Sequence, residues 1–159
     1  MIDQRSRYPI VTFTNNITAT NFVSICNNTF AHFGFPEKMI SDNGPPFRSK
    51  EVKKYTTEKG IKHQRITPLW PQANGEVERF ILPLTKVMFT AHIENKNYTD
   101  EVQKFLMAYR ITPHTSTNVP PSYVMYRRKV RYTIPDYTKN IKDSIDLKLK
   151  YNDENSKNK

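Results

Sequence analysis

Two acidic motifs contain the residues of this sequence best suited to chemistry. The first is SDNGPPF (residues 41–47), in which Asp42 follows a short apolar run and precedes a sharp turn. Ligand-binding and catalytic side chains gather at the carboxyl ends of strands in α/β sheets. The triplet DNG is also ordinary turn chemistry, because Asp and Asn side chains bond their own backbone. Asp42 taken alone is open to both interpretations.

The second motif is PQANGEVERF (residues 71–80), which places Glu76 and Glu78 at the start of an amphipathic helix. Residues two apart on a helix do not share a face, so at most one of the pair points at any given site. Acids in a first helical turn are also favoured by the helix dipole, which gives both a structural interpretation. The interval is more specific, because 35 residues (43–77) separate Asp42 from Glu78.

Together, ISDNGPPF (40–47) and ITPLWPQANGEVERF (66–80) resemble the integrase catalytic core of retroviruses and long-terminal-repeat retrotransposons, most like the Ty3/Gypsy group. That family carries an Asp-Asp-Glu triad with 35 residues between its last two acids. The segment 109–135 also resembles the downstream part of the core in those elements, so the likeness covers about residues 1–136. It implies an α/β, ribonuclease-H-like fold, with a mixed sheet flanked by helices.

The resemblance implies DNA integration by strand transfer, an in-line attack on a phosphodiester assisted by two Mg²⁺ or Mn²⁺ ions about 3.5–4 Å apart. Such ions prefer carboxylate oxygens. By resemblance, Asp42 is the middle acid and a metal ligand. The last acid is Glu78 and not Glu76, because the family pattern Gly-x-x-Glu-Arg falls on Gly75–Arg79.

DNA contacts are implied as well, with element ends and target DNA as partners and a homo-oligomer as the functional form. We expect no small-molecule cofactor and no membrane. The resemblance places Asn43 and Gly44 beside the metals, and Gln72 and Asn74 in a loop near the DNA. Basic side chains that could contact phosphate, or form ordinary surface charge, are Lys62, Arg65, Arg79 and Lys86.

The first acid of the triad has no good match in this chain. Asp3 in MIDQRSRYPIV resembles an acid that ends the second strand of the family and is not catalytic. By resemblance, the catalytic Asp lies on the preceding strand, upstream of Met1. We therefore expect a sheet without its first strand and most of its second, a marginally stable fragment, and a chain that is catalytically incomplete.

The helix after Glu78 also departs from the family, whose basic or polar positions read Leu82, Pro83 and Thr85 here. A proline inside a helix removes a backbone bond, costs on the order of 3 kcal/mol and favours a kink. The alternative function is thus a non-catalytic nucleic-acid-binding or assembly remnant of a transposable element. A nuclease of the same fold is a third hypothesis, disfavoured by the acid spacing.

The bulk composition supports a polyanionic partner. The 159 residues carry a formal charge of +10, and such a balance favours nucleic acid, although a basic surface without a ligand is the alternative. The single cysteine, Cys26, excludes an internal disulfide, and the four histidines do not have zinc spacing. We find no secretion signal, and expect a nuclear or cytoplasmic protein.

The predicted order of elements is β-α-β-α-β-α-α with a short final helix, which is typical of an α/β sheet with helical cover. The expected strands are 7–14, 37–41 and 61–69, and the expected helices are 15–34, 49–60, 75–93, 98–111 and one after 118. Thr18 or Thr20, Ser49 and Thr99 are the expected helix caps. Residues 1–136 form the predicted core domain, and 137–159 a polar, charged, disordered tail or linker.

Overall fold

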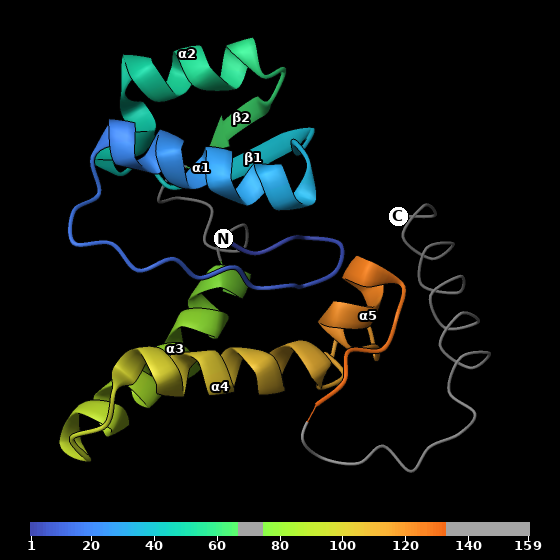
Figure 1. Ribbon diagram of the computed structural model, residues 1–159. Helices are drawn as coiled ribbons and strands as arrows, with labels where there is room; N and C mark the ends of the chain where they lie inside the picture. Colours follow the sequence, from blue (N-terminus) through green and yellow to red (C-terminus); the bar gives the residue numbers. More distant parts are fainter. Residues whose placement is uncertain (67–74, 133–159) are drawn as a thin grey trace. The chain divides into compact units, whose positions relative to one another are not determined.

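The computed structural model describes residues 1–66 and 75–132. The chain divides into two units, which we treat separately (Figure 1). The strand unit is Val11–Phe80, and the helical unit joins Met1–Ile10 to the chain from Ile81 onward. No helix among the described residues is long and apolar enough to cross a bilayer.

The strand unit is built on two short parallel strands, β1 (Lys38–Ser41) and β2 (Lys62–Arg65). Lys38 pairs with Lys62 and Ser41 with Arg65, so the carboxyl ends of the strands lie at the same edge. The elements α1 (Ala19–Phe33), η1 (Pro45–Arg48) and α2 (Lys50–Glu58) complete the unit. Figure 1 shows α1 and α2 lying close to the strand pair.

Local capping chemistry defines both helices of this unit, as the sequence predicts. The Thr18 side chain accepts a hydrogen bond from the amide of Asn21, and Ser49 accepts one from the amide of Val52. The chain leaves α1 at Gly34, whose φ of 81° disfavours any residue with a Cβ. The predicted caps Thr18 and Ser49 are confirmed.

A small apolar core joins the helices to the strands. Its buried members are Cys26, Phe30, Tyr55 and Ile61, with Phe22, Val23 and Met39 packed against them. Burial raises the pKa of the Cys26 thiol to about 11. Phe33, which the helical periodicity places on the buried face, is instead 37% exposed, because α1 ends there.

The helical unit contains most of α3 (Gly75–Ile93), together with α4 (Tyr98–Ile111) and α5 (Pro121–Tyr126). Val102 and Leu106 of α4 are buried. The predicted cap of α4, Thr99, is wrong. The Asn97 side chain accepts from the Thr99 amide and caps the helix, because it lies one position before the first helical residue.

Arg110 holds the N-terminal segment in this unit. Its guanidinium donates to the Pro9 carbonyl, at 2.9 Å from Nη2, and lies 4.6 Å from the centre of the Tyr8 ring. Tyr8 packs edge-on against Tyr126, with ring centres 5.5 Å apart. Burial, followed by the hydrogen bond between the Tyr8 and Tyr126 hydroxyls, raises the Tyr8 pKa to about 12. One cation thus links residues 8–9 to the helices.

The predicted strand at residues 7–14 is wrong. The segment makes one antiparallel bridge, between Ile2 and Pro9, and the Ile10 amide donates to the Met1 carbonyl. Pro9 has no N–H to offer a sheet, and in the described residues no neighbouring strand pairs with the rest of the segment. A strand without a partner leaves its backbone groups to water, so the β-rich composition does not suffice.

The Cys26 thiol is expected to resist alkylation in the native protein. Cys26 is fully buried. Because burial raises the thiol pKa from 9.0 to about 11, the thiolate fraction near pH 8 falls by roughly a hundred-fold. Labelling with iodoacetamide should therefore be at least that much slower in buffer than in urea. Equal rates would show that this core is open. A Cys26→Ala variant provides the unlabelled control.

Replacing Pro83 by alanine is expected to stabilise the protein. α3 runs through Pro83, which cannot donate to the Arg79 carbonyl, so Pro83→Ala should add up to about 3 kcal/mol to the free energy of unfolding in urea. The matched control is Leu82→Ala, because the neighbouring Leu82 side chain is 64% exposed. This control should change the free energy of unfolding by about 0.5 kcal/mol or less. A destabilising Pro83→Ala would mean that the helix needs the proline's geometry.

Candidate active site

Asp42 directly follows β1 and is held by the turn after it. Its Oδ1 accepts a hydrogen bond from the Gly44 amide at 2.8 Å. The turn interpretation is therefore correct for one oxygen of the carboxylate. Asp42 is exposed, and no hydrogen bond or ion pair within the described part of the chain engages Oδ2. Turn chemistry and ligand binding are thus compatible, because one oxygen fixes the side chain while the other stays accessible.

Gly44 is required by the carboxylate and not by its own backbone. Its φ of −57° suits any residue, but a Cβ at this position would lie 2.9 Å from Asp42 Oδ1 and 3.5 Å from the Phe47 ring. Phe47 is itself packed edge-on against Phe22, with ring centres 4.9 Å apart. The missing side chain of Gly44 therefore leaves room for the Asp42 carboxylate to dock on the turn.

Two hydrogen bonds with Ile66, the residue after β2, hold the residues on either side of Asp42. The Ile66 amide donates to the Ser41 carbonyl at 2.8 Å, and the Asn43 side-chain amide donates to the Ile66 carbonyl at 3.0 Å. The Asn43 amide, a candidate for contact with DNA, thus has a structural bond in this protein. Its role toward DNA stays a prediction.

Sequence reasoning missed a second pair of site residues, Ser41 and His63. Ser41 Oγ lies 2.9 Å from His63 Nε2 and donates to the Asp42 carbonyl at 2.9 Å. Burial, and then the charge of Arg65, lower the His63 pKa. Met39 pairs with His63 and Ser41 with Arg65, so alternation puts Ser41 and His63 on one face. Only the strand register, which a single sequence does not give, could have linked them.

Glu78 lies in the first turn of α3 and belongs to the same unit as Asp42. Its side chain is exposed, and no residue in the described ranges forms a hydrogen bond or ion pair with it. Across residues 1–66 and 75–132, no three His, Cys, Asp or Glu side chains form a metal-binding cluster. Asp42 and Glu78 are hard oxygen donors of the kind that Mg²⁺ takes, and their role as metal ligands stays a prediction.

The remaining predicted site residues fall in several places. Gln72 and Asn74 lie outside the described residues. Lys62 and Arg65, at the two ends of β2, are exposed, as is Arg79 on α3. These three exposed cations belong to the strand unit, and their contacts with phosphate stay a prediction.

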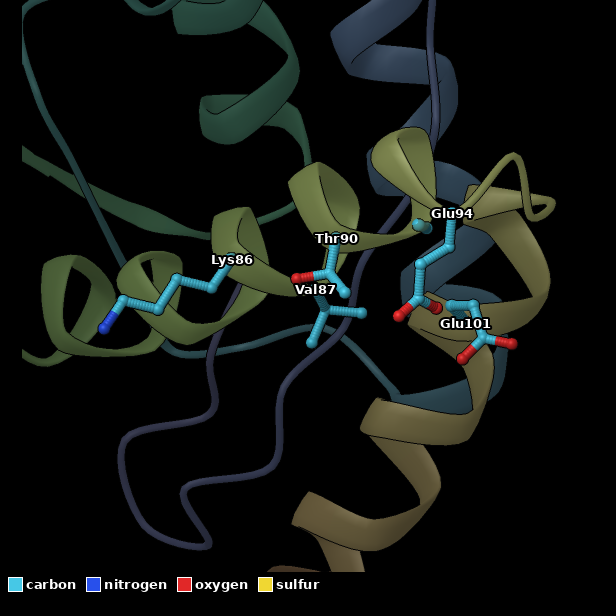
Figure 2. A pocket seen from close by; sticks show the side chains of 6 residues that line it. Lys86, Val87, Thr90, Glu94 and Glu101 are labelled. Atoms are coloured by element: carbon cyan, nitrogen blue, oxygen red, sulfur yellow. The ribbon is translucent and has the colours of Figure 1, made fainter.

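Lys86 belongs to the helical unit, where it lines a hollow of about 230 Å³. The other lining residues are Val87, Thr90, Ala91, Glu94 and Glu101. Figure 2 shows the Lys86 ammonium directed away from the two glutamates. Each glutamate already has a cation, Lys96 at 2.6 Å from Glu94 and Lys104 at 2.7 Å from Glu101. This acid-lined hollow does not favour phosphate.

Comparison with known proteins finds relatives of part of the chain. Residues 1–71 match the family described as Integrase core domain. An uncharacterized Caenorhabditis elegans protein is 30% identical over 135 residues, which are 84% of this chain and 11% of that protein. The Gag-Pro-Pol polyprotein of simian retrovirus SRV-1 is 27% identical over 103 residues, 65% of this chain and 5% of the polyprotein. The chain thus spans a small part of its curated relatives.

Solved structures show the same fold. The simian T-cell lymphotropic virus intasome, in complex with PP2A regulatory subunit B56 gamma, matches with a TM-score of 0.69 and 21% identity over 87% of this chain and 50% of that one. The HTLV-2 integrase catalytic core domain in complex with magnesium (trimeric form) matches with a TM-score of 0.64 and 20% identity, over 79% and 81%. The fold is that of an integrase catalytic core, which is ribonuclease-H-like.

The steric role of Gly44 can be tested by a double-mutant cycle. Gly44→Ala should destabilise the wild-type protein, because the new Cβ displaces Asp42 Oδ1 from the amide. In an Asp42→Ala background the same change should stabilise by about 0.4–1 kcal/mol, since alanine restricts the unfolded chain. The coupling measured by urea unfolding should be about 1–2 kcal/mol.

The matched control for this cycle is Gly75→Ala, because a Cβ there meets no atom within 4 Å. It should show no coupling to Asp42→Ala. Additive effects of Gly44→Ala and Asp42→Ala would contradict the steric account.

Proposed function

We propose that this chain acts as the core of a retroelement integrase, in which Asp42 and Glu78 bind the divalent metals of DNA strand transfer. The observation that carries the proposal is the position of Asp42 and the hydrogen bonding of its carboxylate. It directly follows a parallel strand, inside the segment that matches the integrase core domain. Gly44 fixes one carboxylate oxygen, and the other has no hydrogen-bond partner among residues 1–66 and 75–132. Glu78 follows after 35 intervening residues and is exposed in the first turn of α3.

Magnesium or manganese, when bound, would stabilise the negative charge on the attacking and leaving oxygens of the phosphodiester. The chain's own residues hold the metals and the DNA. The carboxylates of Asp42 and Glu78 supply hard oxygen donors, and the Gly44 amide orients the first of them. Lys62, Arg65 and Arg79 are exposed cations of the same unit, suited to neutralising backbone phosphates.

Asp3 does not serve as the third acid in this proposal, because by resemblance it matches an acid of the family that is not catalytic. Its Oδ2 accepts from the Ser6 amide at 2.7 Å and from Ser6 Oγ at 2.6 Å and closes a local turn. We propose that residues 1–159 provide two acids of the triad, and that strand transfer requires a third that they do not provide. The DNA ends, target DNA and further copies of the chain are the proposed partners, in the nucleus or cytoplasm.

The second candidate function is a nucleic-acid-binding or assembly remnant of a transposable element. The observation that favours it is Pro83 inside α3, next to the exposed Leu82, where the family carries polar or basic residues. The net charge of +10 would support DNA binding without any metal. The two functions differ in whether the acids bind metal.

Mn²⁺ titration separates the two functions. We expect wild-type protein to bind Mn²⁺ by calorimetry, and Asp42→Asn and Glu78→Gln each to weaken the affinity by about ten-fold or more. Glu76→Gln is the matched control, two residues away on the same helix, and should leave the affinity unchanged. Unaltered binding in Asp42→Asn would refute the site. DNA binding with a steep salt dependence, but without Mn²⁺ binding, would support the remnant.

A strand-transfer assay with labelled DNA ends tests the missing acid. The 159-residue protein should join no more ends than Asp42→Asn does, in Mg²⁺ or Mn²⁺, because two carboxylates do not complete the site. Joining by the wild-type chain that Asp42→Asn abolishes would show that these residues suffice.

A further inference from the structure

The Asp42 backbone is held by a relay of side chains that starts on β2. His63 Nε2 lies 2.9 Å from Ser41 Oγ, and Ser41 Oγ lies 2.9 Å from the Asp42 carbonyl oxygen. Ser41 is 9% exposed and His63 is half-buried. A serine hydroxyl carries one proton and two lone pairs, so it can donate to only one of these neighbours.

The proton of Ser41 goes to the Asp42 carbonyl, because that oxygen can only accept. Both short distances are then hydrogen bonds only if His63 Nε2 carries a proton and donates it to Ser41 Oγ. If the hydroxyl donated to His63 instead, two acceptors would face each other at the carbonyl. The arrangement therefore selects the Nε2-protonated ring, with the direction His63 to Ser41 to Asp42.

The His63–Ser41 hydrogen bonds lie beside the other hydrogen bonds that hold the backbone around Asp42. The Ser41 carbonyl is already bound by the Ile66 amide, and the Asn43 side chain by the Ile66 carbonyl. The His63–Ser41 hydrogen bond adds a connection from β2 itself. Through it the Ser41 hydroxyl is held in place to donate to the Asp42 carbonyl. The peptide between Asp42 and Asn43 is thereby fixed, and its orientation determines where the next amides, including that of Gly44, point.

We propose that His63 is a positioning residue for Asp42, which acts through Ser41 to orient the turn that presents the carboxylate. This inference rests on the proposed function, because the residue that His63 positions is the acid proposed to bind metal. His63 touches no reacting group. Residues that orient a metal ligand from outside typically change metal affinity by about 10–100-fold when they are replaced.

The test uses ¹⁵N-labelled protein and two replacements of different chemistry. His63→Phe keeps a flat ring and removes the donor, whereas His63→Gln places an amide donor near the position of Nε2. We expect the Gly44 amide resonance to shift in His63→Phe and in Ser41→Ala, and to stay near its wild-type position in His63→Gln. In the double variant, His63→Phe should add little to Ser41→Ala, because both act on one relay. Circular dichroism confirms folding of each variant.

Equal Gly44 shifts in His63→Phe and His63→Gln, or none in either, would overturn the proposal, as would additive shifts in the double variant. In parallel, His63→Phe should weaken Mn²⁺ binding by about ten-fold or more and His63→Gln by much less. If the wild-type protein bound no Mn²⁺, the proposed function would fail while the Gly44 resonance still decided the role of His63. The two failures are therefore distinguishable.

Discussion

The pairing of β1 with β2 is the constraint on which the candidate site depends. Each strand has four residues, and such a short pair is not stable without packing against other elements. The helices α1 and α2 supply that packing through Cys26, Phe30 and Tyr55. The parallel register then brings the turn after β1 beside the residue that comes after β2, where Ile66 bonds to both Ser41 and Asn43.

The turn at Asp42 shows how one side chain can serve structure and chemistry together. The Gly44 amide binds one carboxylate oxygen, which removes rotational freedom that a metal ligand would otherwise lose on binding. Glycine at position 44 is needed because any Cβ would meet that oxygen. Under the proposed function, this geometry would serve metal-assisted phosphodiester chemistry, since preorganised carboxylates suit divalent metals.

Much of the fold was predictable from the sequence, because its signals are local. Thr18 and Ser49 cap helices that begin directly after them, and α3 and α4 span the predicted ranges. The failures involve non-local information. The β-rich segment 7–14 needs a partner strand, and the Ser41–His63 bond joins residues 22 positions apart through the strand register. The motif predicted Asp42 at a strand end, but not how its turn is held.

The central claim is that Asp42 and Glu78 bind the divalent metals of one site. Paramagnetic broadening by substoichiometric Mn²⁺ tests it most directly, with the amide resonances of Gly44 and Arg79 as reporters on the two acids. The account predicts that both broaden together at the same Mn²⁺ concentration, and that Asp42→Asn or Glu78→Gln reduces the broadening at both. Broadening of one amide without the other, or equal broadening in the variants, would contradict it.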